Sequence, residues 1–129
     1  MKELAIFGST GSIGCSTLNV VRRERDRFAV SILRAGHNLQ RLTEQIREFT
    51  PRHVYILEKH DAEALREQFP GLDIYWGKDG MEAISRLTDF DIGVSALVGV
   101  AGLRPTWNMI QNGKTVALAN KEVLGAAAW

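Results

Sequence analysis

Short apolar runs alternate with segments of helical periodicity along the chain. Runs typical of strands cover residues 4–7, 28–33, 54–57, 72–76, 91–98 and 115–119. Segments whose apolar residues recur at helical spacing lie between them, at 13–21, 39–49, 62–69, 81–87 and 105–113. Strands that alternate with helices in this way indicate parallel pairing through right-handed crossovers. We therefore expect an α/β fold: a Rossmann-like, doubly wound, mainly parallel sheet with helices on both faces.

The composition is that of one globular domain over residues 1–129, because 45% of the residues are apolar and 24% are charged. A net charge of +1 gives no reason to expect a nucleic-acid or membrane partner, and no apolar stretch approaches the length of a membrane span. The single cysteine, Cys15, excludes an internal disulfide and favours a cytoplasmic protein. The last residues, NKEVLGAAAW, are typical of a helix that is just beginning, so we expect truncation before a further domain.

The motif GSTGSIG, residues 8–14, joins the first expected strand to the first expected helix. Its three glycines allow a sharp turn and a close approach of the backbone to a dinucleotide's pyrophosphate, which then meets free N–H groups at the helix N-terminus. The hydroxyls of Ser9, Thr10 and Ser12 are further donors. A tight turn with small packing residues is the alternative, but the strand before and the helix after favour a dinucleotide site.

The residues after the second expected strand indicate which dinucleotide binds. Sites that prefer NAD carry an acidic residue at this place for the ribose 2′-hydroxyl. Here LRAGHN, residues 33–38, has no acid, whereas Arg34, His37 and Asn38 are suited to a 2′-phosphate, which favours NADP. Asn38 is also a candidate N-cap. Arg41, one turn further on, is at least as consistent with a solvated helix face.

Three other patterns carry less weight. Tyr55 and Lys59 have the Y-x-x-x-K spacing of some dehydrogenases, but they fall mainly on an expected strand, where residues four apart are separated by roughly 13 Å. Cys15 at a helix start is most simply a packing residue. The three histidines show no metal-ligand spacing, so no metal site is expected within these residues.

Three motifs in order, GSTGSIGCSTL, SALVGVAGLRPT and LANKE, carry a resemblance that covers essentially the whole chain. The chain resembles the NADPH-binding domain of the 1-deoxy-D-xylulose 5-phosphate reductoisomerases. That resemblance implies an oxidoreductase of non-mevalonate isoprenoid biosynthesis, which isomerises and reduces its sugar phosphate substrate to 2-C-methyl-D-erythritol 4-phosphate. It also implies a divalent metal, Mg²⁺ or Mn²⁺, and a homodimer for the full-length enzyme. The metal ligands and catalytic groups belong to later domains, so the fragment alone is expected to be inactive.

The resemblance also implies roles for particular residues. The segment 96–99 passes near the nicotinamide half of the cofactor, and Lys121 contacts the sugar phosphate. The expected NADPH contacts are Thr10, Gly11, Ser12 and Ile13 in the phosphate loop, Gly36, His37 and Asn38 in the 2′-phosphate turn, and Asn120 and Glu122 near the end. Two departures stand out: His37 replaces the Lys or Arg that the family often has, and residues 123–129 differ from its usual continuation.

Two alternatives stay open at this stage. The chain has features that a stand-alone NADP-sensing module would share, since such regulators use the same glycine loop. A fragment of another NADP-dependent reductase, such as a relative of homoserine dehydrogenase or of a semialdehyde dehydrogenase, is the other alternative. Lys121 favours an enzyme over a sensor, because a sensor needs no lysine that faces a substrate.

Overall fold

A computed structural model describes residues 1–95 and 115–118 of the chain. Strands and helices alternate along this part, with strands at β1 (Lys2–Phe7), β2 (Phe28–Arg34), β3 (His53–Ile56), β4 (Asp73–Trp76), β5 (Ile92–Ser95) and β6 (Thr115–Leu118). The helices are α1 (Ser12–Arg23), α2 (Leu39–Phe49), α3 (Lys59–Gln68) and α4 (Gly77–Ser85). None of the helices in the described ranges is long and apolar enough to cross a membrane.

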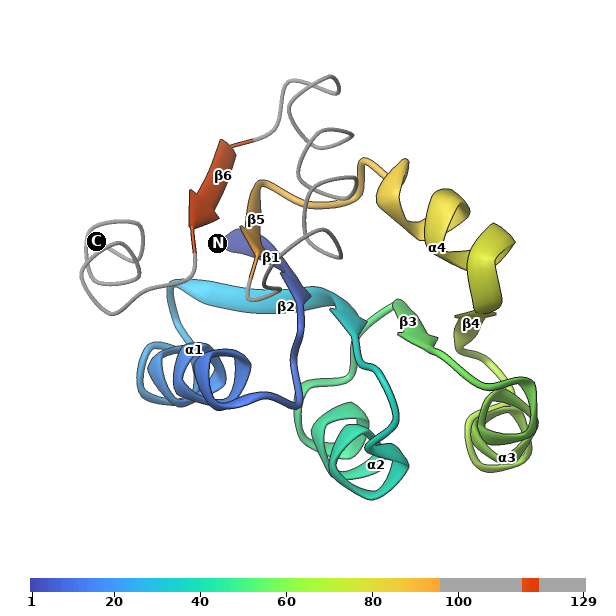
Figure 1. Cartoon of the computed structure of the whole chain (residues 1–129). Helices are drawn as coiled ribbons and strands as arrows, with labels where there is room; N and C mark the ends of the chain where they lie inside the picture. The colour runs from blue at the N-terminus through green and yellow to red at the C-terminus, as the bar shows by residue number, and fades with distance from the viewer. Residues whose placement is uncertain (96–114, 119–129) are drawn as a thin grey trace.

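The strands form one sheet in the order β4-β3-β2-β1-β5-β6, and every neighbouring pair is parallel (Figure 1). The chain moves outward from β1 to β4 and then returns to the other side of β1 with β5. The strand order therefore reverses at β1. In open α/β sheets, ligands bind beyond the carboxyl ends of the strands at such a reversal. The predicted Rossmann-like, parallel α/β fold is confirmed.

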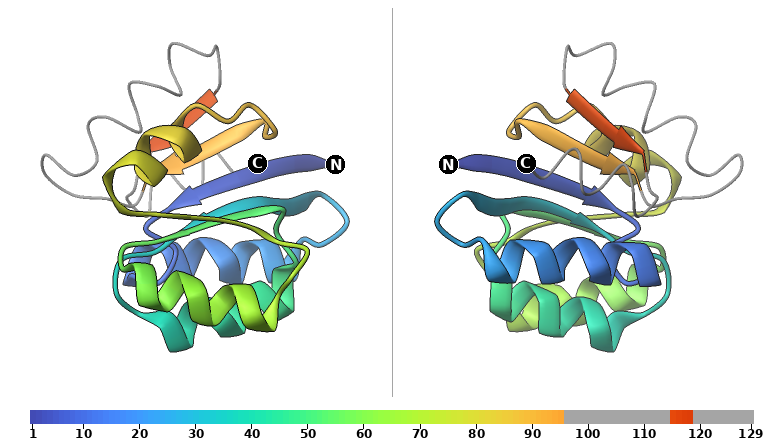
Figure 2. Two further views of the ribbon diagram at one scale, coloured as in Figure 1. Left: turned by 90° about the vertical axis from the view of Figure 1, so that its right-hand side faces the viewer. Right: turned by 90° about the vertical axis from the view of Figure 1, so that its left-hand side faces the viewer.

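Helices cover both faces of the sheet. Helices α1, α2 and α3 lie on one face and α4 lies on the other (Figures 1 and 2). Alternate residues of β1 contribute to the two layers of the core. Leu4 and Ile6 belong to the hydrophobic cluster that includes residues of α1, α2 and α3. Ala5 and Phe7 belong to the cluster on the other face, which includes Ile84 of α4. Burial on both faces explains why the strands are almost continuously apolar in sequence.

A bulge interrupts the pairing of β1 with β2. Leu4 pairs with Val30 and the next residue, Ala5, pairs with Ile32, so that Ser31 is an extra residue in β2. The Ser31 hydroxyl is buried and donates a hydrogen bond to the Leu4 carbonyl at 3.2 Å. Because side chains alternate between faces along a strand, the extra residue reverses the facing of the rest of β2.

The expected strands and helices within the described residues are all present, with shifted ends. The largest shift is at α4, which was expected at 81–87 and begins at Gly77. Gly77 has a φ of 69°, and a Cβ on Gly80 would lie 3.2 Å from the Tyr75 carbonyl carbon. These glycines therefore start the helix earlier than expected and let it pack closely on β4. The helix expected at 105–113 lies outside the described residues.

Candidate nucleotide-binding site

The glycine loop connects β1 to α1 at the carboxyl edge of the sheet. Gly8 has a φ of 96°, a conformation that side chains disfavour, so glycine is required at this turn. The N–H groups of Gly8 and Ser9 both donate to the Arg34 carbonyl at the end of β2, each at 2.9 Å. The loop is therefore anchored to the neighbouring strand.

The other two glycines of the motif differ in what surrounds them. A Cβ on Gly14 would lie 2.1 Å from the Gly8 carbonyl oxygen and 2.6 Å from the Ser9 Cα, so α1 can approach the loop only if this residue is glycine. A Cβ on Gly11 would have the Gly8 oxygen at 3.7 Å as its single neighbour, and Gly11 is exposed. Backbone conformation explains Gly8 and packing explains Gly14, whereas Gly11 is open toward solvent. An open glycine suits the close approach of a phosphate group.

Helix α1 begins with free N–H groups. The first helical bond runs from the Cys15 N–H to the Gly11 carbonyl at 2.9 Å, so the N–H groups of Ser12, Ile13 and Gly14 have no acceptor within the helix. No side chain caps this end, and its first turn holds no acidic residue. These donors and the positive end of the helix dipole together suit an anion.

The structure brings the predicted loop residues together. Thr10, Gly11, Ser12 and Ile13 follow one another from the loop into α1, and each is exposed or half-buried. Ser9 differs from the expectation that its hydroxyl faces a ligand, because its side chain is fully buried. Its role is at the backbone, where its N–H fixes the loop to β2.

The predicted 2′-phosphate turn follows β2 at the same edge of the sheet. Gly36, His37 and Asn38 are all exposed, and a Cβ on Gly36 would meet no atom within 4 Å. The Asn38 side chain accepts a hydrogen bond from the Arg41 N–H at 3.0 Å, which confirms the predicted N-cap of α2. Because β1 and β2 are parallel neighbours, this turn and the glycine loop lie side by side.

Arg34 does not join that exposed turn, contrary to expectation. It is only 6% exposed, its guanidinium carbon lies 5.1 Å from the centre of the Tyr55 ring, and its Nη2 is 3.3 Å from the Met81 sulfur. Burial lowers the pKa of Arg34. The reason for the difference is the bulge at Ser31, after which Arg34 pairs with Phe7 and so faces the layer beneath α4.

Two side chains of α2 contact the glycine loop. The Arg41 Nη1 donates to the Thr10 carbonyl at 3.2 Å, so Arg41 is more than a solvated surface residue. The Gln45 Nε2 donates to the Ser9 carbonyl at 2.8 Å, a contact that the sequence analysis missed. The available signal was the position of Gln45, a polar residue on the same helix face as Leu42 and Phe49, both of which are buried.

The remaining candidates divide into two groups. Tyr55 is buried in β3 and donates its hydroxyl to the Gly77 carbonyl at 2.8 Å, and burial raises its pKa. Lys59 is exposed at the start of α3, so the pair does not share a helix face as proton transfer would require. The predicted cofactor segment 96–99 and the predicted contacts of Asn120, Lys121 and Glu122 lie outside the described residues.

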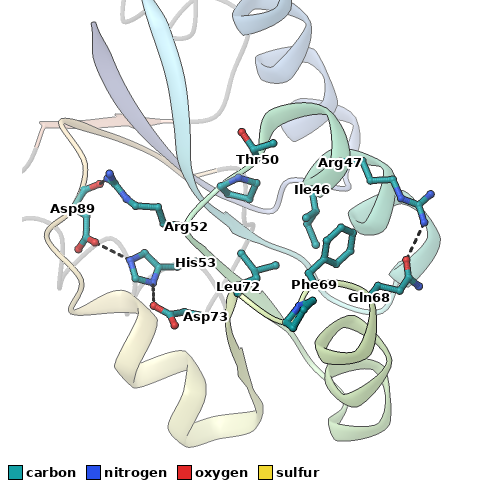
Figure 3. A pocket seen from close by; sticks show the side chains of 13 residues that line it. Ile46, Arg47, Thr50, Arg52, His53, Gln68, Phe69, Leu72, Asp73 and Asp89 are labelled. Atoms are coloured by element: carbon teal, nitrogen blue, oxygen red, sulfur yellow. Dashed lines mark hydrogen bonds and ion pairs between the residues drawn. The ribbon is translucent and has the colours of Figure 1, made fainter.

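A separate hollow lies at the amino ends of β3 and β4 (Figure 3). Its lining includes His53, whose Nε2 is 2.7 Å from an Asp89 oxygen and whose Nδ1 is 3.2 Å from an Asp73 oxygen. The hydrogen bond to His53 lowers the pKa of Asp89. Within the described ranges no group of three histidine, cysteine or acidic residues is placed to hold a metal ion. This hollow is at the opposite edge of the sheet from the glycine loop.

Comparisons with known proteins converge on one family. The family model described as 1-deoxy-D-xylulose 5-phosphate reductoisomerase matches residues 4–128. The reductoisomerase of Prosthecochloris aestuarii is 49% identical over 129 residues, which is 98% of this chain and 34% of the relative. That of Nitrosospira multiformis is 44% identical over 128 residues, 96% of this chain and 32% of the relative. The chain thus spans about a third of the length of these relatives.

Solved structures agree with the sequence comparisons. A reductoisomerase in complex with NADPH, fosmidomycin and magnesium aligns with a TM-score of 0.84 and 32% identity, over 96% of this chain and 31% of that one. The reductoisomerase of Zymomonas mobilis in complex with NADPH aligns with a TM-score of 0.82 and 33% identity, over 98% and 34% of the two chains.

Proposed function

Because the chain belongs to the 1-deoxy-D-xylulose 5-phosphate reductoisomerase family, we propose that it is the NADPH-binding domain of such an enzyme. The complete enzyme isomerises 1-deoxy-D-xylulose 5-phosphate and reduces the product to 2-C-methyl-D-erythritol 4-phosphate. This chain supplies the cofactor end of that reaction. The metal ligands and the groups that act on the substrate's carbon skeleton belong to the rest of the enzyme, so the chain alone is inactive.

One observation carries the proposal: the open first turn of α1 beside an unobstructed Gly11. The N–H groups of Ser12 and Ile13 and the close approach at Gly11 fit a pyrophosphate, which carries negative charge and many acceptor oxygens. Thr10 adds a hydroxyl at the rim of the loop. These groups bind and orient the nucleotide, whose nicotinamide supplies the hydride for the reduction step.

The turn after β2 is proposed to select NADPH over NADH. Its exposed residues Gly36, His37 and Asn38 include no carboxylate that would repel a 2′-phosphate. His37 supplies a donor to the phosphate and, when protonated, a positive charge.

The remaining assignments rest on the family motif LANKE. We propose that Asn120 and Glu122 contact NADPH and that the Lys121 ammonium binds the sugar phosphate substrate. A homodimer of the complete enzyme is proposed from the family resemblance, and a cytoplasmic location from the single cysteine, which suits a reducing compartment. A sensor of NADP that has no enzymatic partner domain is disfavoured by the substrate-facing lysine.

Titration of the chain with NADPH and NADH, followed by tryptophan fluorescence, tests the cofactor proposal. We expect NADPH to bind at least tenfold more tightly than NADH, a difference of about 1.4 kcal/mol. His37→Ala should reduce that preference, whereas His60→Ala, which removes an exposed imidazole from α3, should leave it unchanged. A chain that is folded by circular dichroism yet binds neither nucleotide would refute the proposal.

The catalytic part needs a complete protein. A chimera in which this chain replaces the aligned third of the Prosthecochloris aestuarii relative should consume NADPH when 1-deoxy-D-xylulose 5-phosphate is added. Lys121→Ala in that chimera should raise the KM for the sugar phosphate with little change in the Kd of NADPH. A raised Kd for NADPH with an unchanged KM for the substrate would contradict the assignment of Lys121.

A further inference from the structure

We propose that Arg41 and Gln45 of α2 are positioning residues for the cofactor: they hold two successive carbonyl groups of the glycine loop so that its free N–H groups face the nucleotide. The proposal rests on the proposed binding of NADPH to this loop. It assigns α2 a role beyond packing, because both side chains contact the backbone of the loop.

The contact of Gln45 fixes the first carbonyl. Gln45 is only 7% exposed, and its Nε2 donates to the Ser9 carbonyl at 2.8 Å. In a trans peptide the carbonyl and the next N–H point in opposite directions. A Ser9 carbonyl that points toward α2 therefore directs the Thr10 N–H away from α2. That N–H has no acceptor among the described residues, so it is available to a ligand.

The contact of Arg41 fixes the second carbonyl and links the two phosphate-binding segments. Its Nη1 donates to the Thr10 carbonyl at 3.2 Å and lies 3.7 Å from the Cys15 sulfur. Its backbone N–H donates to the Asn38 side chain at 3.0 Å. Arg41 thus joins the 2′-phosphate turn through its main chain to the pyrophosphate loop through its side chain.

A buried glutamine at position 45 lowers the stability of the fold if its side chain serves only for packing. It lies in line with the buried Leu42 and Phe49, and its Oε1 is buried without a partner among the described residues. A buried carbonyl oxygen without a hydrogen bond lowers stability, whereas a methionine would fill a similar volume without that cost. The hydrogen bond that its Nε2 makes to the loop is the compensating function.

The binding test compares variants that remove each donor. Gln45→Met should weaken NADPH and NADH by the same factor of about ten, because the loop binds the part that both share. Arg41→Ala should likewise weaken both equally, and Arg41→Lys should recover part of the loss because it retains a donor. Arg47→Ala, on the same helix but bonded to Gln68, is the control and should change neither affinity.

Two binding results would overturn the proposal. Unchanged affinities in Gln45→Met would show that the loop does not need this donor. A loss of NADPH affinity alone in Arg41→Ala would make Arg41 a direct 2′-phosphate ligand rather than a positioning residue. All affinities are measured well below the unfolding temperature of each variant, so that a loss of stability alone does not change them.

Amide hydrogen exchange without nucleotide separates this proposal from the binding of NADPH. The Ser9 and Gly11 N–H groups are bonded to the Arg34 and Gly8 carbonyls, so they report on the order of the loop. Gln45→Met should speed their exchange at least about threefold, and Arg47→Ala should leave it unchanged. If the wild type bound neither nucleotide, the proposed function would fail. Equal exchange rates in Gln45→Met and the wild type would refute the proposal that Gln45 orders the loop, whether or not a nucleotide binds.

Discussion

The effects of the second and third glycines of the loop, Gly11 and Gly14, can be separated by experiment, because the structure predicts different outcomes for the same substitution. Gly14→Ala places a methyl group 2.1 Å from the Gly8 oxygen and 2.7 Å from the Ser9 carbonyl carbon. Gly11→Ala places one 3.7 Å from the Gly8 oxygen, at a residue whose φ is already −78°. The first change should damage the fold, and the second should damage binding alone.

The magnitudes follow from these contacts. The atoms that the Gly14→Ala methyl meets are backbone, so α1 and the loop must move apart by roughly 1 Å; overpacking of this kind costs about 3 kcal/mol. The better helix propensity of alanine offsets about 1 kcal/mol. The remaining loss of about 2 kcal/mol should lower the Tm by roughly 8 °C in a chain of this size. For Gly11→Ala, the weaker N-cap and the lower entropy of the unfolded chain nearly cancel, so the change should stay within about 0.5 kcal/mol.

Thermal unfolding by circular dichroism and titration with NADPH measure both quantities. Gly11→Ala should unfold like the wild type but bind NADPH at least about tenfold more weakly, because its methyl group occupies the approach of the pyrophosphate. Gly71→Ala is the control, since a Cβ there would meet no atom within 4 Å and the residue precedes β4. A Gly14→Ala variant as stable as the wild type, or a Gly11→Ala variant with normal affinity, would refute the reasoning.

Three further changes test other parts of the structure. Asn38→Ala removes the N-cap of α2 and should cost about 1 kcal/mol in urea unfolding; an unchanged midpoint would mean that water replaces the cap. Tyr55→Phe deletes the hydroxyl that donates to the Gly77 carbonyl and should lower the free energy of unfolding by about 1 kcal/mol in the same assay. An unchanged free energy would mean that this hydrogen bond does not stabilise the fold. The hydrogen bond to His53 holds the pKa of Asp89 below its ordinary value, so in acid the unfolded chain binds more protons than the folded chain. The stabilisation by Asp89 is therefore present above about pH 4 and is lost as the pH falls further. Asp89→Asn should flatten that acid limb of the stability curve, and an equally steep limb in the variant would contradict the assignment.

The sequence was sufficient for the features that depend on local chemistry. The alternation of apolar runs with helical segments predicted the parallel sheet, and the spacing of the glycines placed the loop between β1 and α1. Asn38 was predicted as an N-cap because a short polar side chain before an amphipathic segment commonly has this role.

The features that sequence reasoning missed depend on tertiary contacts. Gln45 lies 36 residues from Ser9, and their contact arises only when α2 packs beside α1. Arg34 was expected at the exposed turn, but one extra residue in β2 turned it to the other face. The helix expected at 81–87 begins earlier, and the role of Gly80 within it became apparent only from the nearby backbone of Tyr75. In each case the local sequence was compatible with two arrangements, and packing selected one.

The bulge at Ser31 shows where this strand can lose a residue. Deletion of Ser31 would leave Val30 opposite Leu4 and Ile32 opposite Ala5, as they are now, and would restore regular alternation along β2. Val30 would stay in the layer beneath α1 and α2, and Arg34 would stay opposite Phe7 on the other face. The turn at residues 24–27 precedes the strand, so a change of length there also leaves the core residues in place. Alignments of relatives should therefore place their gaps near this strand either in that turn or at Ser31.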